Sequence, residues 1–283
     1  MRPFPCTRGT GKLRIGQIEY ANCTPIFTAL KANFDCSAYR FVSGVPSTLN
    51  SMLAAGDIDL CPSSSIEYGK SFEKYSLLPN LSISSIGAVK SVLLFSRVPI
   101  ADLANLPVGL TTESDTSINL LKIILAKKYG FHNLFQRTSL PLSEAIQQFS
   151  ALLLIGDTAL KASLANNGLY VYDLGELWHD FSGLPFVFAL WIVRRDAAAA
   201  KHAEIKALCD ELQQAKELAY DSYESIASNS KEKAWINSEA LVGYWRTISY
   251  DLTPAHVAGL QSFFRYAAEL GILAREPEIS IFS

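Results

Sequence analysis

The sequence predicts an α/β protein of two lobes with a ligand cleft between them, and three observations support this fold class. First, the chain has 283 residues, of which 49% are hydrophobic, and chains above roughly 250 residues tend to divide their core between two lobes. Second, short apolar runs alternate with helical segments, a pattern typical of parallel strands joined by right-handed crossovers. Third, the run FVFALWIV at 186–193 is apolar enough for a strand buried on both faces. We expect this last strand to carry the chain back to the first lobe.

A first series of elements is expected between residues 13 and 65. Thr24 is expected as the N-cap of a helix whose first residue is Pro25. Gly56 is expected to end the next helix. The expected strands cover 13–18, 39–42 and 58–61. The expected helices start at Pro25, cover 46–55, and start again at 62–65.

A second series follows a Gly- and Ser-containing stretch at 81–87. Strands are expected over 91–96, 108–110 and 152–155, a connector over 99–107, and helices over 116–129 and from Thr158. Amphipathic helices are expected over 203–219 and 254–270, the latter with Thr253 as N-cap and Gly271 as its stop. Residues 1–97 and 190–283 are therefore expected to form lobe 1, and residues 98–189 an inserted lobe 2.

Composition excludes several classes of function. The formal net charge is −2, from 25 basic and 27 acidic residues, so no basic excess favours nucleic acid as a partner. The start of the chain has no apolar stretch of the length of a signal peptide, and no run of about 18 apolar residues occurs. We therefore expect no membrane partner and a cytoplasmic location. The five cysteines are odd in number and form no C-x-x-C pair, which argues against a disulfide framework or a zinc site.

Polar residues gather where the expected strands end, which is where ligands bind in two-lobed α/β proteins. Hydroxyls and backbone N–H groups at helix starts bind anions, although for one such loop taken alone simple helix capping is the favoured explanation. Three such loops at one cleft favour a carboxylate-binding site. The candidate residues are Asn22; Ser63, Ser64 and Ser65; Thr111, Thr112, Ser114, Thr116 and Ser117; and Gly156 and Asp157. Asp157 is equally compatible with orienting a substrate hydroxyl and with capping the next helix.

The usual catalytic signatures are absent from the sequence. It contains no P-loop, no G-x-G-x-x-G after a strand, no H-E-x-x-H and no G-x-S-x-G. Of the four histidines, His202 and His256 fall on amphipathic helices and are expected to be solvated. His132 follows a helix end, and His179 is expected in a surface helix. No histidine is expected to act as a general base.

Six segments resemble the chorismate dehydratases of the futalosine route to menaquinone, which have a type II periplasmic-binding-protein-like fold. They are LRIGQIEYANCTPIF, VPSTLNSMLAAGDIDLCPSSSIEYGK, SVLLFS, GLTTESDTSINLLK, LLLIGDTAL and GLPFVFALW. The resemblance implies a lyase that removes water from chorismate to give 3-[(1-carboxyvinyl)oxy]benzoate. It also implies that Asn22 and Ser91 are the catalytic residues, that no metal or cofactor takes part, and that a carboxylate of the substrate takes the proton.

Two positions depart from the family pattern. Ala21 stands where a larger apolar residue is common, and Thr24 stands where an apolar residue often precedes Pro25. Residues 1–12 match nothing in the family. Three other readings remain open at this point: a carboxylate-binding protein of the same fold without catalysis, the sister dihydroxynaphthoate synthase, which needs a histidine base, and a structural core without a ligand.

Overall fold

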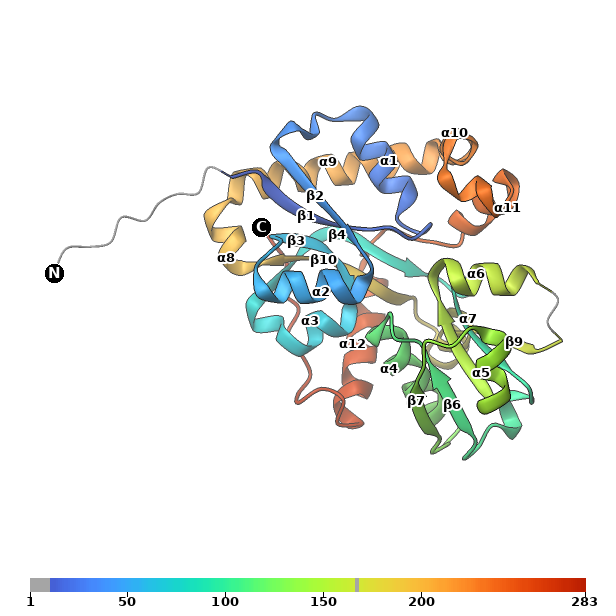
Figure 1. The fold of residues 1–283 in the computed structure, drawn as a ribbon. Helices are drawn as coiled ribbons and strands as arrows, with labels where there is room; N and C mark the ends of the chain where they lie inside the picture. The colour runs from blue at the N-terminus through green and yellow to red at the C-terminus, as the bar shows by residue number, and fades with distance from the viewer. Residues whose placement is uncertain (1–10, 166–167) are drawn as a thin grey trace.

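Two mixed β-sheets organise the chain in a computed structural model that describes residues 11–165 and 168–283. The first sheet has the order β2-β1-β3-β10-β4 and the second the order β7-β6-β8-β5-β9 (Figure 1). The strands of the first sheet are β1 (Leu13–Ile18), β2 (Tyr39–Gly44), β3 (Leu60–Ser64), β4 (Tyr75–Ser85) and β10 (Phe186–Arg194). The strands of the second sheet are β5 (Val92–Ser96), β6 (Pro107–Leu110), β7 (Leu134–Arg137), β8 (Ala151–Ile155) and β9 (Tyr170–Asp173).

Helices cover both faces of the first sheet, with α1 and α9 on one side and α2 and α3 on the other (Figure 1). In the first half of the chain the helices are α1 (Thr24–Asn33), α2 (Pro46–Ala55), α3 (Ser65–Ser71), α4 (Asp115–Ile123), α5 (Leu142–Gln148) and α6 (Gly156–Leu164). They are followed by α7 (Leu174–Ser182), α8 (Arg195–Ala200), α9 (His202–Asp221), α10 (Tyr223–Asn229), α11 (Ser238–Trp245) and α12 (Pro254–Glu269). A π-helical turn at Ile124–Lys128 continues α4, and short 3₁₀ turns lie at Cys36–Ala38, Phe72–Lys74, Ile100–Asp102 and Lys231–Ala234.

The sheets are mixed, whereas the alternation of strands and helices predicts parallel strands. β1 is parallel to β2 and β3, but β10 is antiparallel to both β3 and β4. β10 returns from the second sheet and therefore enters the first from the opposite end. Its burial along nearly its whole length confirms the prediction of a doubly covered strand at 186–193.

Two segments that were not predicted as strands belong to strands for a tertiary reason. Ser63 and Ser64 do not open a helix; they end β3, where they pair with Leu190 and Ala189 of β10. The stretch at 81–87 largely belongs to the 11-residue β4, whose buried Ser84 hydroxyl donates to the carbonyl of Ser249 at 3.0 Å. In both places a partner strand or segment far along the chain satisfies serines that locally favour turns.

Sheet pairing also shifts the expected boundary between the lobes. β5, at Val92–Ser96, is hydrogen-bonded to β8 and β9 of the second sheet. The chain therefore leaves the first sheet after β4, earlier than the boundary expected after residue 97.

Three local predictions differ from the structure. Thr24 is the first residue of α1, and its N-cap is Cys23. The helix predicted from Thr158 begins at Gly156. His256 is buried, not solvated. It lies in the first turn of α12, where its Nδ1 and the side chain of Thr253 form a capping box.

The described cysteines are unpaired, with Cys23, Cys61 and Cys209 buried, and Cys6 lies outside the described residues. Within the described ranges, no helix has the length and apolar character needed to cross a membrane, and no group of three metal-ligating side chains occurs.

Candidate active site

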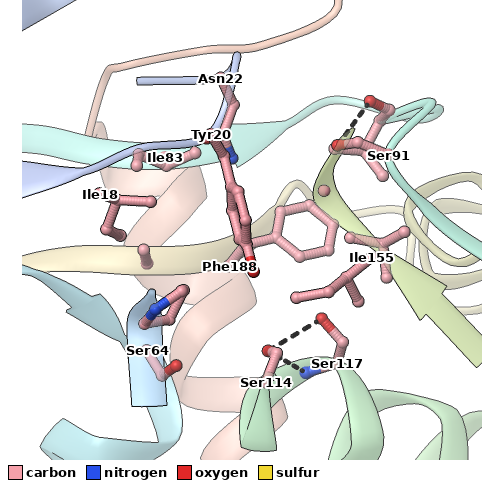
Figure 2. Close-up of a pocket in the computed structure, with 15 residues that line it drawn as sticks. Ile18, Tyr20, Asn22, Ser64, Ile83, Ser91, Ser114, Ser117, Ile155 and Phe188 are labelled. Atoms are coloured by element: carbon pink, nitrogen blue, oxygen red, sulfur yellow. Dashed lines mark hydrogen bonds between the residues drawn. The ribbon is translucent and has the colours of Figure 1, made fainter. Parts of the chain in front are cut away.

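A pocket of about 540 Å³, including its open mouth, lies between the two sheets. Its polar lining comes from both halves of the molecule, and Ile18, Ile83, Ile155 and Phe188 supply apolar walls (Figure 2). The polar side chains are those of Tyr20, Asn22, Ser64, Ser91, Ser114 and Ser117. An apolar cavity with a few converging polar groups is the usual form of a small-molecule site.

Asn22 lies in the turn between β1 and α1, which the C-terminal segment holds in place. The Tyr250 hydroxyl donates to the carbonyl of Asn22 at 2.8 Å, and the Trp245 indole N–H donates to the carbonyl of Ala21 at 2.8 Å. The side-chain Oδ1 of Asn22 is buried and has no hydrogen-bond partner in the protein. A buried acceptor without a partner is rare, so this oxygen is available to a donor on a ligand.

Ser91 directly precedes β5 and is 2% exposed. Its carbonyl accepts a hydrogen bond from Gly156 N at 2.8 Å. Its hydroxyl makes a long contact of 3.5 Å with the carbonyl of Val89. Burial raises the pKa of Tyr244, and a hydrogen bond from Ser91 partly opposes that rise. The Ser91 hydroxyl therefore lines the pocket beside two protein groups, the carbonyl of Val89 and the phenol of Tyr244.

Ser114 and Ser117 bring the start of α4 into the pocket. Ser114 is the N-cap, and its Oγ accepts from Ser117 N at 3.3 Å and lies 3.2 Å from Ser117 Oγ. Capping and pocket lining, which sequence analysis treats as alternatives, therefore coincide at Ser114.

Other candidate hydroxyls join the walls of the cleft and do not line the pocket. Ser63 donates to Asn50 Oδ1 at 2.6 Å, and Ser65 donates to the carbonyl of Val187 at 2.6 Å. Thr116 accepts from Ile66 N at 3.1 Å, which ties α4 to α3.

The remaining candidates of the 111–117 loop lie beside the pocket. Thr111 is buried and accepts from Glu113 N at 3.2 Å. Thr112 is exposed and lines a neighbouring groove that also contains Arg137. The structure therefore brings together Asn22, Ser64, Ser91, Ser114, Ser117 and Gly156 from the predicted set.

The Asp157 carboxylate links the two halves of the molecule across the cleft. Its Oδ1 accepts from Ala21 N at 2.9 Å, so α6 of one half holds the turn that carries Asn22 in the other. Burial raises the pKa of Asp157, the bond from Ala21 lowers it, and the negative charge of Glu232 raises it further. Neither predicted role, substrate orientation or capping, describes this contact.

The departure at Thr24 has a partner in the structure. The Thr24 hydroxyl donates to Oε1 of Glu232 at 2.8 Å, and Glu232 is fully buried with its Oε2 unpartnered. A buried carboxylate needs such donors, so a hydroxyl at position 24 replaces the apolar residue that often stands there.

Sequence analysis missed Tyr20 and Phe188. The Tyr20 ring packs over Gly156, where a Cβ atom would lie 3.1 Å from the ring. Its hydroxyl is buried without a hydrogen-bond partner. The available signal is the position of Tyr20 in the same turn as Asn22.

The polar groups of the pocket include no cationic side chain among the described residues. None of the described residues that line it is lysine, arginine or histidine. A negatively charged ligand would therefore be held by hydroxyl, amide and backbone donors, and its carboxylates would keep a basicity that a neighbouring cation would lower.

Comparison with known sequences points to one family. A family described as "Menaquinone biosynthesis" matches residues 13–269. The chorismate dehydratase of Thermus thermophilus is 31% identical over 264 residues, which cover 88% of this chain and 93% of that protein. The chorismate dehydratase of Campylobacter jejuni is 32% identical over 178 residues, which cover 62% of this chain and 64% of that protein.

Comparison with solved structures confirms the fold. A protein of Archaeoglobus fulgidus superposes with a TM-score of 0.74 at 19% identity, over 95% of this chain and all of the other. The periplasmic aliphatic sulphonate binding protein of Escherichia coli gives a TM-score of 0.68 at 17% identity, over 95% of this chain and 90% of the other. The two-lobed periplasmic-binding-protein-like fold expected from the resemblance is confirmed.

Proposed function

This chain belongs to the menaquinone biosynthesis family, and we propose that it is the hydro-lyase that converts chorismate to 3-[(1-carboxyvinyl)oxy]benzoate and water. The observation that carries this proposal is one pocket containing the unpartnered Oδ1 of Asn22 and the buried hydroxyl of Ser91. The ring hydroxyl of chorismate offers a hydrogen to the first and an acceptor oxygen to the second.

The reaction needs orientation more than a protein base. The ring hydrogen next to the leaving hydroxyl is activated through the conjugated ring carboxylate, and its loss with the hydroxyl makes the ring aromatic. In our proposal the enolpyruvyl carboxylate of the substrate takes this hydrogen as a proton. The C–H electron pair enters the ring, the C–O bond breaks, and the hydroxyl leaves as water with that proton.

Within this scheme Asn22 and Ser91 hold the ring hydroxyl and the enolpyruvyl side chain in reacting geometry. Ser91 donates to the oxygen on which charge develops as the C–O bond breaks, and preorganised donors of this kind lower the barrier. The absence of a cation among the described lining residues suits this chemistry, because it leaves the substrate carboxylate basic.

The test is product formation from chorismate, followed by chromatography and by the new aromatic absorbance. We expect Asn22→Ala and Ser91→Ala each to lower turnover about 10²–10³-fold. Ser96→Ala is the matched control, because Ser96 is a buried serine at the far end of β5 that donates to the carbonyl of Val98 at 2.7 Å. Near-wild-type rates in both site variants would refute these assignments.

The same experiment separates the alternative functions. A rise in melting temperature with chorismate but no product would indicate a binding protein, a role that the fold alone also permits. The sister synthase reaction would require a histidine base, and no histidine is among the described residues that line the pocket.

Two further expectations belong to this proposal. We propose that residues 98–189, together with β5, form the inserted lobe that closes over the substrate. We also propose a cytoplasmic location, which cell fractionation would test.

A further inference from the structure

Tyr20 presents a second unsatisfied polar atom in the pocket. Its hydroxyl is buried, and no hydrogen bond joins it to the protein. The Glu113 carboxylate raises the pKa of Tyr20 by its charge and by a weak hydrogen-bonding interaction, but no hydrogen bond of ordinary geometry joins the two groups. The hydroxyl is therefore free to donate to a ligand.

The direction of the Tyr20 side chain separates it from the two residues already assigned. In Figure 2 the ring extends away from Asn22 and Ser91, and its hydroxyl lies toward Ser114 and Ser117. The ring carboxylate of chorismate is para to the hydroxyl that leaves. If Asn22 and Ser91 hold that hydroxyl, the ring carboxylate lies toward the end of the pocket that the Tyr20 hydroxyl reaches.

We propose that Tyr20 donates a hydrogen bond to the ring carboxylate of the substrate, a role that rests on the proposed function. Hydrogen bonds from a hydroxyl to a carboxylate are short and about twice as strong as neutral ones. The ring carboxylate gains negative charge when the activated ring hydrogen is removed, so a donor placed there also stabilises the transition state.

The surroundings keep Tyr20 protonated, as a donor must be. Burial raises the pKa of Tyr20, and the negative charges of Glu113 and then of Asp157 raise it further. The Tyr20 phenol therefore stays neutral, and a hydrogen-bond donor, at neutral pH.

A structural role for Tyr20 makes a different prediction. The ring covers Gly156 whether or not it carries a hydroxyl, so a packing role is preserved in Tyr20→Phe. Because the hydroxyl has no partner in the protein, we expect this variant to be at least as stable as the wild type.

Binding of two ligands to the full-length protein tests the proposal directly. We expect Tyr20→Phe to weaken binding of 3-[(1-carboxyvinyl)oxy]benzoate about 10- to 150-fold, the range for loss of a hydrogen bond to a charged group. Binding of 2-phenoxyacrylate, which keeps the enolpyruvyl carboxylate but lacks the ring carboxylate, is expected to stay unchanged. The kcat/KM for chorismate is expected to fall by a similar factor.

The control is Glu113→Gln, which removes the charge nearest the hydroxyl. We expect Glu113→Gln to bind 3-[(1-carboxyvinyl)oxy]benzoate as tightly as the wild type or more tightly, because it removes a negative charge near the ring carboxylate. A Tyr20→Phe protein within twofold of the wild type for the benzoate, or equally weakened for both ligands, would overturn the proposal. A wild-type protein that forms no product would instead overturn the proposed function, while the comparison of the two ligands would still decide the role of Tyr20.

Discussion

Replacing Gly156 with alanine tests how the pocket is assembled. Gly156 is the first residue of α6 and has φ +58°, a left-handed conformation that costs roughly 1–2 kcal/mol for a residue with a Cβ atom. The new Cβ would lie 3.1 Å from two atoms of the Tyr20 ring. The ring must therefore shift by a few tenths of an ångström, and its hydroxyl with it.

Gly183 provides a matched control for the backbone part of this effect. It ends α7 with φ +70°, and a Cβ atom there would meet nothing within 4 Å. We expect Gly156→Ala and Gly183→Ala each to lower the free energy of unfolding by roughly 1–2 kcal/mol. Only Gly156→Ala is expected to lower turnover of chorismate as well.

Urea denaturation and steady-state kinetics of the two variants are the measurements. Wild-type turnover in Gly156→Ala, at the same loss of stability as Gly183→Ala, would show that contact between Tyr20 and Gly156 does not position the ring in the working enzyme. Unchanged stability in both variants would refute the argument from backbone conformation.

Two predictions concern stability. Thr24→Val removes the hydroxyl that donates to the buried Glu232, and we expect it to lower the free energy of unfolding by about 1–3 kcal/mol. Urea denaturation of this variant, of Glu232→Gln and of the double variant measures the coupling energy between the two side chains. Additive effects of the two substitutions would contradict the prediction. Burial lowers the pKa of His256 in the folded protein, so the imidazole binds a proton more readily in the unfolded chain. The contribution of the neutral, buried imidazole to stability is therefore present above about pH 6.5 and is lost as the pH falls below that value. We expect His256→Gln, which keeps a side chain suited to the capping box, to flatten the fall in stability between pH 7.5 and pH 5.5; an unchanged slope would show that other groups cause it.

Elements with strong local signals were predicted closely. The strand at Leu13–Ile18 and the helix at Pro46–Ala55, with Gly56 in the left-handed region at its end, have the predicted bounds. The last helix has its Thr253 cap and begins at Pro254 as expected. Each of these depends on neighbours within a few residues, which are visible in any sequence.

Weak strands at sheet edges could not be predicted in the same way. β7 and β9 are four residues long and largely exposed. Their apolar runs are only two or three residues long, and they are strands because β6 and β5 supply hydrogen-bond partners. The partner strands lie far along the chain, so no local sequence pattern predicts the pairing.

The hydroxyl residues of the site also depend on tertiary structure, because neighbours in the sequence have different roles. Successive residues of a strand point to opposite faces, and Ser64 accordingly lines the pocket while Ser63 bonds to Asn50. On α4, Ser114 and Ser117 are three residues apart and share a face, whereas Thr116 contacts α3.

The amino-acid order by itself determined the α/β class, the return of the chain at 186–193, the family, and the loops from which the pocket is built. Only the tertiary structure decided which hydroxyls in those loops meet the ligand and which join the walls. The reason is that a side chain's direction depends on where its strand or helix begins, and pairing with β10 and packing of α4 on α3 set those points. Tyr20 could be identified only from the tertiary structure for the same reason, because the packing of the surrounding elements determines whether its hydroxyl has a hydrogen-bond partner.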